Sequence, residues 1–165
     1  TLKRMNRKYD TARYLQSVEL LKAHFDRPAV TTDLIVGFPE ETEAEFEKTL
    51  DFIRACGFAR MHIFPYSRRK GTPAATMPHQ VPNGEKADRA HRAAAVAAEL
   101  QRAYLAGCVG QTYPVLFEQP KDGWFFGHAP NYAEVLVKGE DLHNQIRSVT
   151  ITSADGEFLY GTIKE

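Results

Sequence analysis

The sequence has little cysteine and no long hydrophobic run. Among its 165 residues only Cys56 and Cys108 are cysteines, too few and too far apart in the chain for a metal-binding framework. No stretch has the pattern of a secretory leader or of a membrane-spanning segment. We therefore expect a chain with no membrane partner, in the reducing environment of the cytoplasm.

The chain also lacks net charge, because 21 Lys and Arg balance 21 Asp and Glu. The charge is uneven: residues 1–110 hold 17 basic and 13 acidic residues (+4), whereas residues 111–165 hold 4 and 8 (−4). Bulk charge therefore does not favour nucleic-acid binding, which would need local basic patches. The hydrophobic fraction of 43% is ordinary for a globular protein.

The stretch 30–42 predicts a strand, a tight turn and the start of a helix. Apolar side chains alternate in the strand with polar ones, which include Asp33. Gly37 ends the strand, and Thr42 with Glu45 three residues later is a capping box. A strand with one apolar face and an aspartate on the other is typical of a parallel βα barrel, with helices outside and polar groups inside.

A helix is predicted before this strand and a second strand after it. The helix has a cap at Asp10, and the second strand covers residues 58–66, where Arg60 and His62 alternate with apolar residues. The apolar stripe of the helix is Tyr14, Val18, Leu21 and Phe25. Helix, strand, helix, strand is the repeat of a βα barrel or doubly wound sheet. Two strands form only part of such a sheet, so we expect an open edge prone to self-association.

Residues 66–75 form a loop that contains three adjacent cations, Arg68, Arg69 and Lys70. Cations beside the carboxyl end of a strand favour contact with an anion or nucleic acid, and a basic surface turn is the alternative. An alanine-rich helix from about residue 85 to residue 106 follows the loop.

From residue 111 the pattern changes to short alternating runs separated by turn residues. The predicted strands are 113–118, 124–128, 132–137, 146–152 and 158–163. Five short strands are typical of a small closed barrel related to the oligonucleotide-binding fold. Trp124, Phe125, Phe126 and Tyr132 could stack on bases, but so small a barrel needs most of its aromatic side chains in the core.

The motifs taken together resemble a known family. They are D-L-I-V-G-F-P-E-E-T at residues 33–42, then H-I-F-P-Y-S-R-R-K-G-T-P-A at residues 62–74, then the small barrel. Their order and spacing are similar to the radical SAM methylthiotransferases, most of all to the branch that acts on threonylcarbamoyladenosine in tRNA. The resemblance implies an α/β fold in which residues 1–110 are the C-terminal part of a radical SAM barrel. Residues 111–165 would be a TRAM domain, a five-stranded antiparallel β-barrel.

The resemblance also implies an activity. Members of the family use S-adenosylmethionine and two 4Fe–4S clusters, one of which supplies sulfur. The substrate implied is N6-threonylcarbamoyladenosine 37 in the anticodon loop of tRNA, which receives a methylthio group at C2. The alternatives are isopentenyladenosine 37, a ribosomal-protein aspartate, or a non-enzymatic RNA-binding module. The family's cluster-binding cysteines are absent from this chain, so we expect it alone to bind no cluster and to be inactive.

The family's motifs assign site residues in two stretches. The residues implied to bind the cofactor are Asp33, Ile35, Gly37, Glu41, Tyr66 and Ser67. Those implied to bind substrate or RNA are Arg68, Arg69, Lys70 and Thr72. No catalytic residue is assigned. Glu40 stands where the family usually has glycine, which leaves open the shape of the turn and the roles of Glu40 and Glu41.

Overall fold

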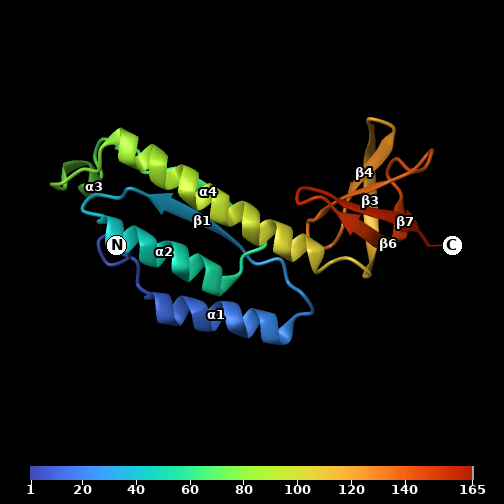
Figure 1. The fold of residues 1–165 in the computed structure, drawn as a ribbon, viewed down its shortest axis with the longest axis horizontal. Coiled ribbons are helices and arrows are strands. Elements are labelled where there is room, and N and C mark those ends of the chain that lie inside the picture. The colour runs from blue at the N-terminus through green and yellow to red at the C-terminus, as the bar shows by residue number, and fades with distance from the viewer. Residues whose placement is uncertain (165) are drawn as a thin grey trace. The chain divides into compact units, whose positions relative to one another are not determined.

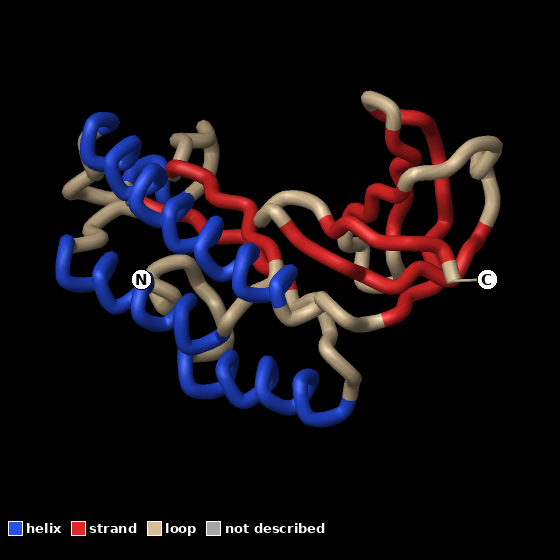
Figure 2. Tube along the Cα trace, turned by 45° about the vertical axis from the view of Figure 1, so that its right-hand side comes forward, coloured by secondary structure: helices blue, strands red, loops and turns tan. Residues whose placement is uncertain are grey.

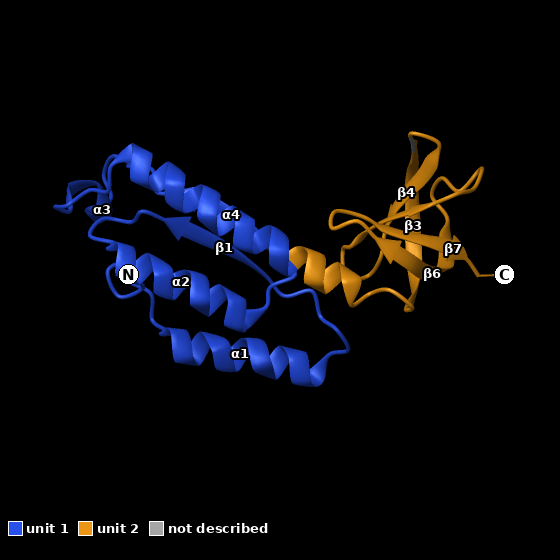
Figure 3. Ribbon diagram, in the orientation of Figure 1, with its two compact units in different colours: residues 1–100 blue, residues 101–165 orange. Residues whose placement is uncertain are grey.

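A computed structural model describes residues 1–164, apart from the side chain of Lys121. The chain divides into two compact units, Thr1–Leu100 and Gln101–Glu165 (Figure 3). The boundary falls within a helix, upstream of the predicted domain boundary after residue 110, which stays a prediction. Across the described residues, no helix combines the length and the apolar character needed to span a membrane.

Unit 1 is a two-stranded parallel sheet with helices on one face (Figure 1). Its elements are α1 (Thr11–His24), β1 (Thr31–Val36), α2 (Glu43–Cys56), β2 (Arg60–Pro65), α3 (Pro73–Thr76) and α4 (Asn83–Ala106), the last of which also contributes to unit 2. One hydrophobic core joins α1, α2 and α4 to the sheet. The alternation of helix and strand confirms the predicted α/β class.

The register of the sheet confirms the alternation read from the sequence. β1 pairs with β2 in parallel, so that Asp33 lies opposite His62 and Val36 opposite Pro65. Leu34 and Val36 pack into the helix-covered core, whereas Asp33, His62 and Phe64 are exposed on the other face. This second face also carries apolar side chains, Ile35 and Phe64, of which Phe64 is 50% exposed. Self-association through an edge of the sheet stays a prediction.

Helix α1 begins as predicted but packs over a shorter length. Asp10 caps it by accepting a hydrogen bond from the Arg13 amide at 2.8 Å. Val18 is buried in the core, but Leu21 and Phe25 are 43% and 61% exposed. The expected continuous stripe is therefore wrong at Leu21 and Phe25, whereas Tyr14, Leu15 and Val18 pack in the core.

The start of α2 is fixed by the predicted capping box. The Thr42 hydroxyl accepts from the Glu45 amide at 3.2 Å, and the Glu45 carboxylate accepts from the Thr42 amide at 3.1 Å. Gly57 ends the helix in the left-handed region, with φ at 57°. The face that α2 buries carries Phe46, Leu50, Ile53 and Cys56. Both ends and the buried face of α2 were thus predictable from local pattern.

Unit 2 contains a closed five-stranded barrel, seen as curled strands in Figure 2. Its strands are β3 (Thr112–Lys121), β4 (Trp124–His128), β5 (Glu134–Val137), β6 (Ile146–Ala154) and β7 (Leu159–Ile163), in the order β3-β4-β5-β7-β6. Four pairings are antiparallel as predicted, but β5 and β7 pair in parallel. The barrel therefore contains both parallel and antiparallel pairs. Strand β7 lies between β5 and β6, and it runs parallel to β5 and antiparallel to β6.

The aromatic side chains of β4 divide between the two faces of the barrel. Phe125 packs against the core and contacts Phe117 edge-to-face at 6.5 Å. Trp124 and Phe126 alternate with it and are only partly buried, and Tyr132 is 83% exposed. The core therefore takes fewer of these aromatic residues than the size of the barrel led us to expect.

We predict that Gly127→Ala destabilises unit 2 by about 1–3 kcal/mol through overpacking. A Cβ atom at Gly127 would lie 2.4 Å from the Leu116 carbonyl oxygen and 2.9 Å from Val115 Cγ1. Urea unfolding followed by circular dichroism measures the loss. Gly84→Ala is the matched control, because a Cβ there meets no described heavy atom within 4 Å. Equal midpoints for the two variants would contradict the prediction.

Candidate functional site

The turns that follow β1 and β2 lie side by side. Val36 and Pro65 are partners in the parallel register, and the Tyr66 amide donates to the Val36 carbonyl at 2.8 Å. The segment after Gly37 and the loop after Tyr66 therefore leave the same edge of the sheet. This is the edge at which parallel α/β proteins carry their sites. The structure brings both predicted motif stretches to it.

Helix α4 packs closely against both turns. Gly37 has φ at 69°, and a Cβ atom there would lie 2.2 Å from Lys86 Cγ. Only glycine fits this position, because conformation and space both exclude a side chain. Lys86 Nζ donates to the Tyr66 carbonyl at 3.1 Å and lies 5.9 Å from the centre of the Tyr66 ring. One lysine of α4 thus contacts both turns.

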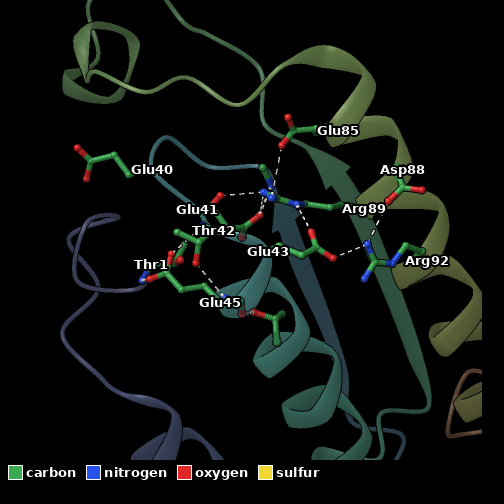
Figure 4. A network of polar contacts seen from close by, with 12 residues as sticks. Thr1, Glu40, Glu41, Thr42, Glu43, Glu45, Glu85, Asp88, Arg89 and Arg92 are labelled. Atoms are coloured by element: carbon green, nitrogen blue, oxygen red, sulfur yellow. Dashed lines mark hydrogen bonds and ion pairs between the residues drawn. The ribbon is translucent and has the colours of Figure 1, made fainter.

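Glu41 lies inside the protein, where Arg89 of α4 holds it. Its carboxylate accepts from the Gly37 amide at 2.6 Å and from an Arg89 Nη at 3.0 Å (Figure 4). The same Arg89 nitrogen donates to the Glu41 carbonyl at 3.0 Å. Burial raises the pKa of Glu41 above its ordinary value, while the Gly37 amide and the Arg89 charge act in the opposite direction. The Glu41 carboxylate is therefore committed to the protein itself.

Arg89 was not predicted from the sequence. Its side chain is only 4% exposed, and it lies in the helical row that continues with the buried Ala93 and Val96. An arginine on the buried stripe of an otherwise amphipathic helix was the one available signal. Its partner Glu41 is 48 residues away in sequence, so no local motif joins the two.

Outside this pair, carboxylates and arginines link α2 with α4 (Figure 4). Arg89 lies 3.4 Å from Glu43, and Arg92 lies 2.6 Å from Glu43 and 3.1 Å from Asp88. Arg92 also pairs with Glu47. These partners are largely exposed, so each pair contributes little to stability compared with a buried one.

The capping box of α2 is also tied to the beginning of the chain. Arg4 donates to the Glu45 carboxylate at 2.6 Å and to the Glu40 carbonyl at 3.3 Å. The hydrogen bond from Arg4 holds the pKa of Glu45 at about 2. Arg4, one of the basic residues near the start of the chain, is thus committed to an ion pair within unit 1.

The predicted residues of β1 do not join the buried pair. Asp33 is exposed and Ile35 partly exposed on the face of the sheet away from the helices. In the loop after β2, Ser67, Arg68, Arg69 and Lys70 are exposed. The Thr72 hydroxyl donates to the Arg69 carbonyl at 2.8 Å, which shapes the loop.

An open depression of about 690 Å³ lies beside the end of β2. It is lined by Pro65, Tyr66, Ser67, Arg68, Gln80, Val81, Pro82, Asn83, Lys86 and Ala87. The Tyr66 hydroxyl is buried without a hydrogen-bond partner among the described residues. The Ser67 hydroxyl, the unpaired Tyr66 phenol and the cations Arg68 and Lys86 fit a ligand that carries hydroxyls and a carboxylate, as S-adenosylmethionine does.

The described residues do not fit an iron–sulfur cluster. They contain no group of three or more His, Cys, Asp or Glu side chains that could hold a metal ion. Cys56 is buried in unit 1 and Cys108 in unit 2. An iron–sulfur cluster therefore has no ligand set among the described residues.

Unit 2 has an open depression of its own, of about 630 Å³. Trp124, Lys138 and Tyr160 are among the residues that line it. Lys138 Nζ lies 3.9 Å from the centre of the Trp124 ring, and Trp124 contacts Tyr160 edge-to-face at 5.3 Å. An indole can stack on a nucleobase and a cation beside it can contact a phosphate, so this combination suits a nucleotide.

The known proteins similar to this chain include several named for the methylthiolation of tRNA. Residues 1–53 match the family described as the radical SAM superfamily. The chain is 38% identical to threonylcarbamoyladenosine tRNA methylthiotransferase MtaB of Bacillus subtilis (strain 168), over 96% of the chain and 38% of that protein. It is 45% identical to tRNA-2-methylthio-N(6)-dimethylallyladenosine synthase of Salinispora arenicola (strain CNS-205), over 96% of the chain and 35% of that protein.

Residues 1–53 are similar to the radical SAM superfamily, and the helix–strand alternation of unit 1 agrees with that match. Nearly the whole chain is similar to part of several tRNA methylthiotransferases, which confirms the resemblance of its motifs. The chain spans 35% to 39% of the length of the curated relatives it matches. The names of those relatives give two different modified adenosines.

The turn keeps a glycine-like conformation at Glu40, where the family usually has glycine. Glu40 has φ at 65°, in the left-handed region that strains any residue with a Cβ atom. The Glu40 amide donates to the His79 carbonyl at 3.0 Å, which holds this conformation. Glu40 therefore adopts, with strain, a conformation that glycine adopts freely.

We predict that Glu40→Gly stabilises unit 1 by about 0.5–1 kcal/mol, because relief of strain exceeds the added freedom of the unfolded chain. The ion pair lost is weak, since Arg4 Nε and the Glu40 carboxylate are 3.8 Å apart and partly exposed. Thermal unfolding measures the gain. Glu40→Ala removes the same carboxylate but keeps Cβ, so a gain as large in this control would refute the strain argument.

Proposed function

We propose that the protein takes part in the methylthiolation of a modified adenosine in tRNA by radical SAM chemistry. The observation that carries the proposal is the depression beside β2, flanked by the glycine turn after β1, in a chain similar to tRNA methylthiotransferases. Radical SAM proteins use S-adenosylmethionine, which supplies a radical able to activate an unreactive C–H bond. The residues described here then bind, orient and shield.

The adenosyl ligand is proposed to bind in the depression and against the turn after β1. Tyr66 and Ser67 contribute hydroxyl groups, and Lys86 adds an ammonium group that had no assigned role. Gly37 lets the backbone come close to a ligand. Asp33 and Ile35 face the same open side of the sheet and could complete the contact surface from β1. Glu41 supports the turn from inside the protein.

The cations after β2 are proposed to contact the tRNA. Arg68, Arg69 and Lys70 are exposed, and Arg68 also lines the depression. Their position beside the adenosyl site suits phosphates that flank a nucleotide held for reaction. Thr72 acts through its hydrogen bond to the loop backbone. The anticodon loop is the part of tRNA that we propose to lie here.

For the substrate we propose N6-threonylcarbamoyladenosine 37, modified at C2. The support is the motif pattern together with the relatives named for threonylcarbamoyladenosine. Dimethylallyladenosine is the second candidate, because relatives named for it are 37% to 45% identical. A ribosomal-protein aspartate and a non-enzymatic role are not favoured, since these relatives are all named as enzymes of tRNA.

We predict that cells lacking the gene lose methylthio-threonylcarbamoyladenosine from their tRNA. Mass spectrometry of nucleosides from digested tRNA measures the loss. Threonylcarbamoyladenosine without the methylthio group should accumulate. Loss of the methylthio form of isopentenyladenosine instead would assign the protein to the other branch. An unchanged nucleoside profile would contradict the proposed function.

We predict that Arg69→Ala in the full-length protein weakens tRNA binding and makes it less sensitive to salt. Each phosphate contact with a single strand contributes about 0.7 to the slope of log affinity against log salt, so the slope should fall by about that amount. Filter binding at several salt concentrations measures it, with iron content and adenosyl affinity unchanged. Arg54→Ala is the control, because Arg54 is an exposed arginine of α2. Equal slopes for the two variants would remove Arg69 from the tRNA contact.

A further inference from the structure

Arg89 is a buried cation to which neither the motifs nor the relatives assign a role. Its side chain is 4% exposed on the buried row of α4, although a charged group is costly to remove from water. Removing one partner of a buried ion pair is strongly destabilising, because it leaves the other charge buried and uncompensated. What Arg89 bonds to therefore indicates what it does.

Both side-chain hydrogen bonds of Arg89 go to one residue of the turn after β1, whereas its ion pairs with Glu43 and Glu85 are longer, at 3.4 and 3.6 Å. One Nη donates both to the Glu41 carbonyl and to the Glu41 carboxylate, each at 3.0 Å. That carboxylate also accepts from the Gly37 amide at 2.6 Å. The Glu41 carboxylate thus joins the two ends of the turn, Gly37 and Glu41, and the Arg89 guanidinium group joins Glu41 to α4.

The same helix positions the second turn. Lys86 precedes Arg89 by three residues, which places both on one side of α4. Lys86 donates to the Tyr66 carbonyl at 3.1 Å and packs against Gly37. The loops on both sides of the proposed adenosyl site therefore take their positions from a single rigid helix.

We propose that Arg89 is a positioning residue for the adenosyl site, which fixes the turn Gly37–Glu41 through Glu41 without touching the ligand. The inference rests on the proposed function, because the ligand is the one proposed above. It differs from a purely structural role, in which Arg89 stabilises the packing of α4 and the turn has the same shape without it.

Three variants of the full-length protein separate these two roles. Arg89→Met leaves the Glu41 carboxylate buried without its cation. Glu41→Gln with Arg89→Met removes both charges and keeps an oxygen that can accept from Gly37, so stability should return. Arg92→Met is the matched control, because Arg92 lies on the same helix and shares Glu43 with Arg89 but is partly exposed.

S-adenosylmethionine binding is measured by titration calorimetry at a temperature where circular dichroism shows every variant folded. Arg89→Met should lose tenfold or more in affinity, and Arg92→Met should stay within twofold of wild type. The double variant should regain its melting temperature but not its affinity, because the Glu41 carbonyl still lacks its donor. A purely structural residue would instead give affinity that returns together with stability.

Wild-type affinity in folded Arg89→Met, or recovery of affinity in the double variant, would overturn the inference. If the wild type bound no S-adenosylmethionine, the proposed function would fail instead. Hydrogen exchange of the Gly37 amide then tests the positioning role alone. Protection should be lost in Arg89→Met and kept in Arg92→Met, and equal protection in both would refute a fixed turn.

Discussion

The buried contact between Glu41 and Arg89 is the interaction on which the arrangement of unit 1 around its candidate site depends. A buried ion pair gives little net stability, because the loss of hydration offsets the attraction of the charges. In the observed arrangement one Nη of Arg89 donates to both the carbonyl and the carboxylate of Glu41. That arrangement sets the turn after β1 against α4, and Lys86 on the same helix sets the loop after β2. The site is therefore organised by a helix that contributes none of its predicted residues.

The local elements of the fold were predictable because their signals are close together in sequence. Alternation in residues 31–36 gave β1, and Thr42 with Glu45 gave the start of α2. The stripe on α1 failed at Leu21 and Phe25, since periodicity shows which face is apolar but not how far its partner extends. The parallel pairing of β5 with β7 was missed for a related reason, because strand order depends on contacts between distant segments.

The candidate site was predictable in its parts but not in its connections. The motif residues Gly37 and Tyr66 lie together because parallel strands end at the same edge. Arg89 could not be assigned, because no local pattern marks a partner 48 residues away. Glu40 raised the question of a changed turn, and its φ of 65° shows that backbone contacts impose the conformation that glycine would adopt freely.

Trp124 is the only tryptophan of the chain and lies on the barrel of unit 2, with Lys138 Nζ 3.9 Å from its ring centre. An indole next to a positive charge has an emission spectrum that depends on that charge. The tryptophan emission of this chain therefore reports on unit 2 and not on the core of unit 1. A nucleotide that displaced Lys138 would shift the emission, whereas unfolding confined to unit 1 would leave it unchanged. The sequence thus carries a built-in optical label for one of its two units.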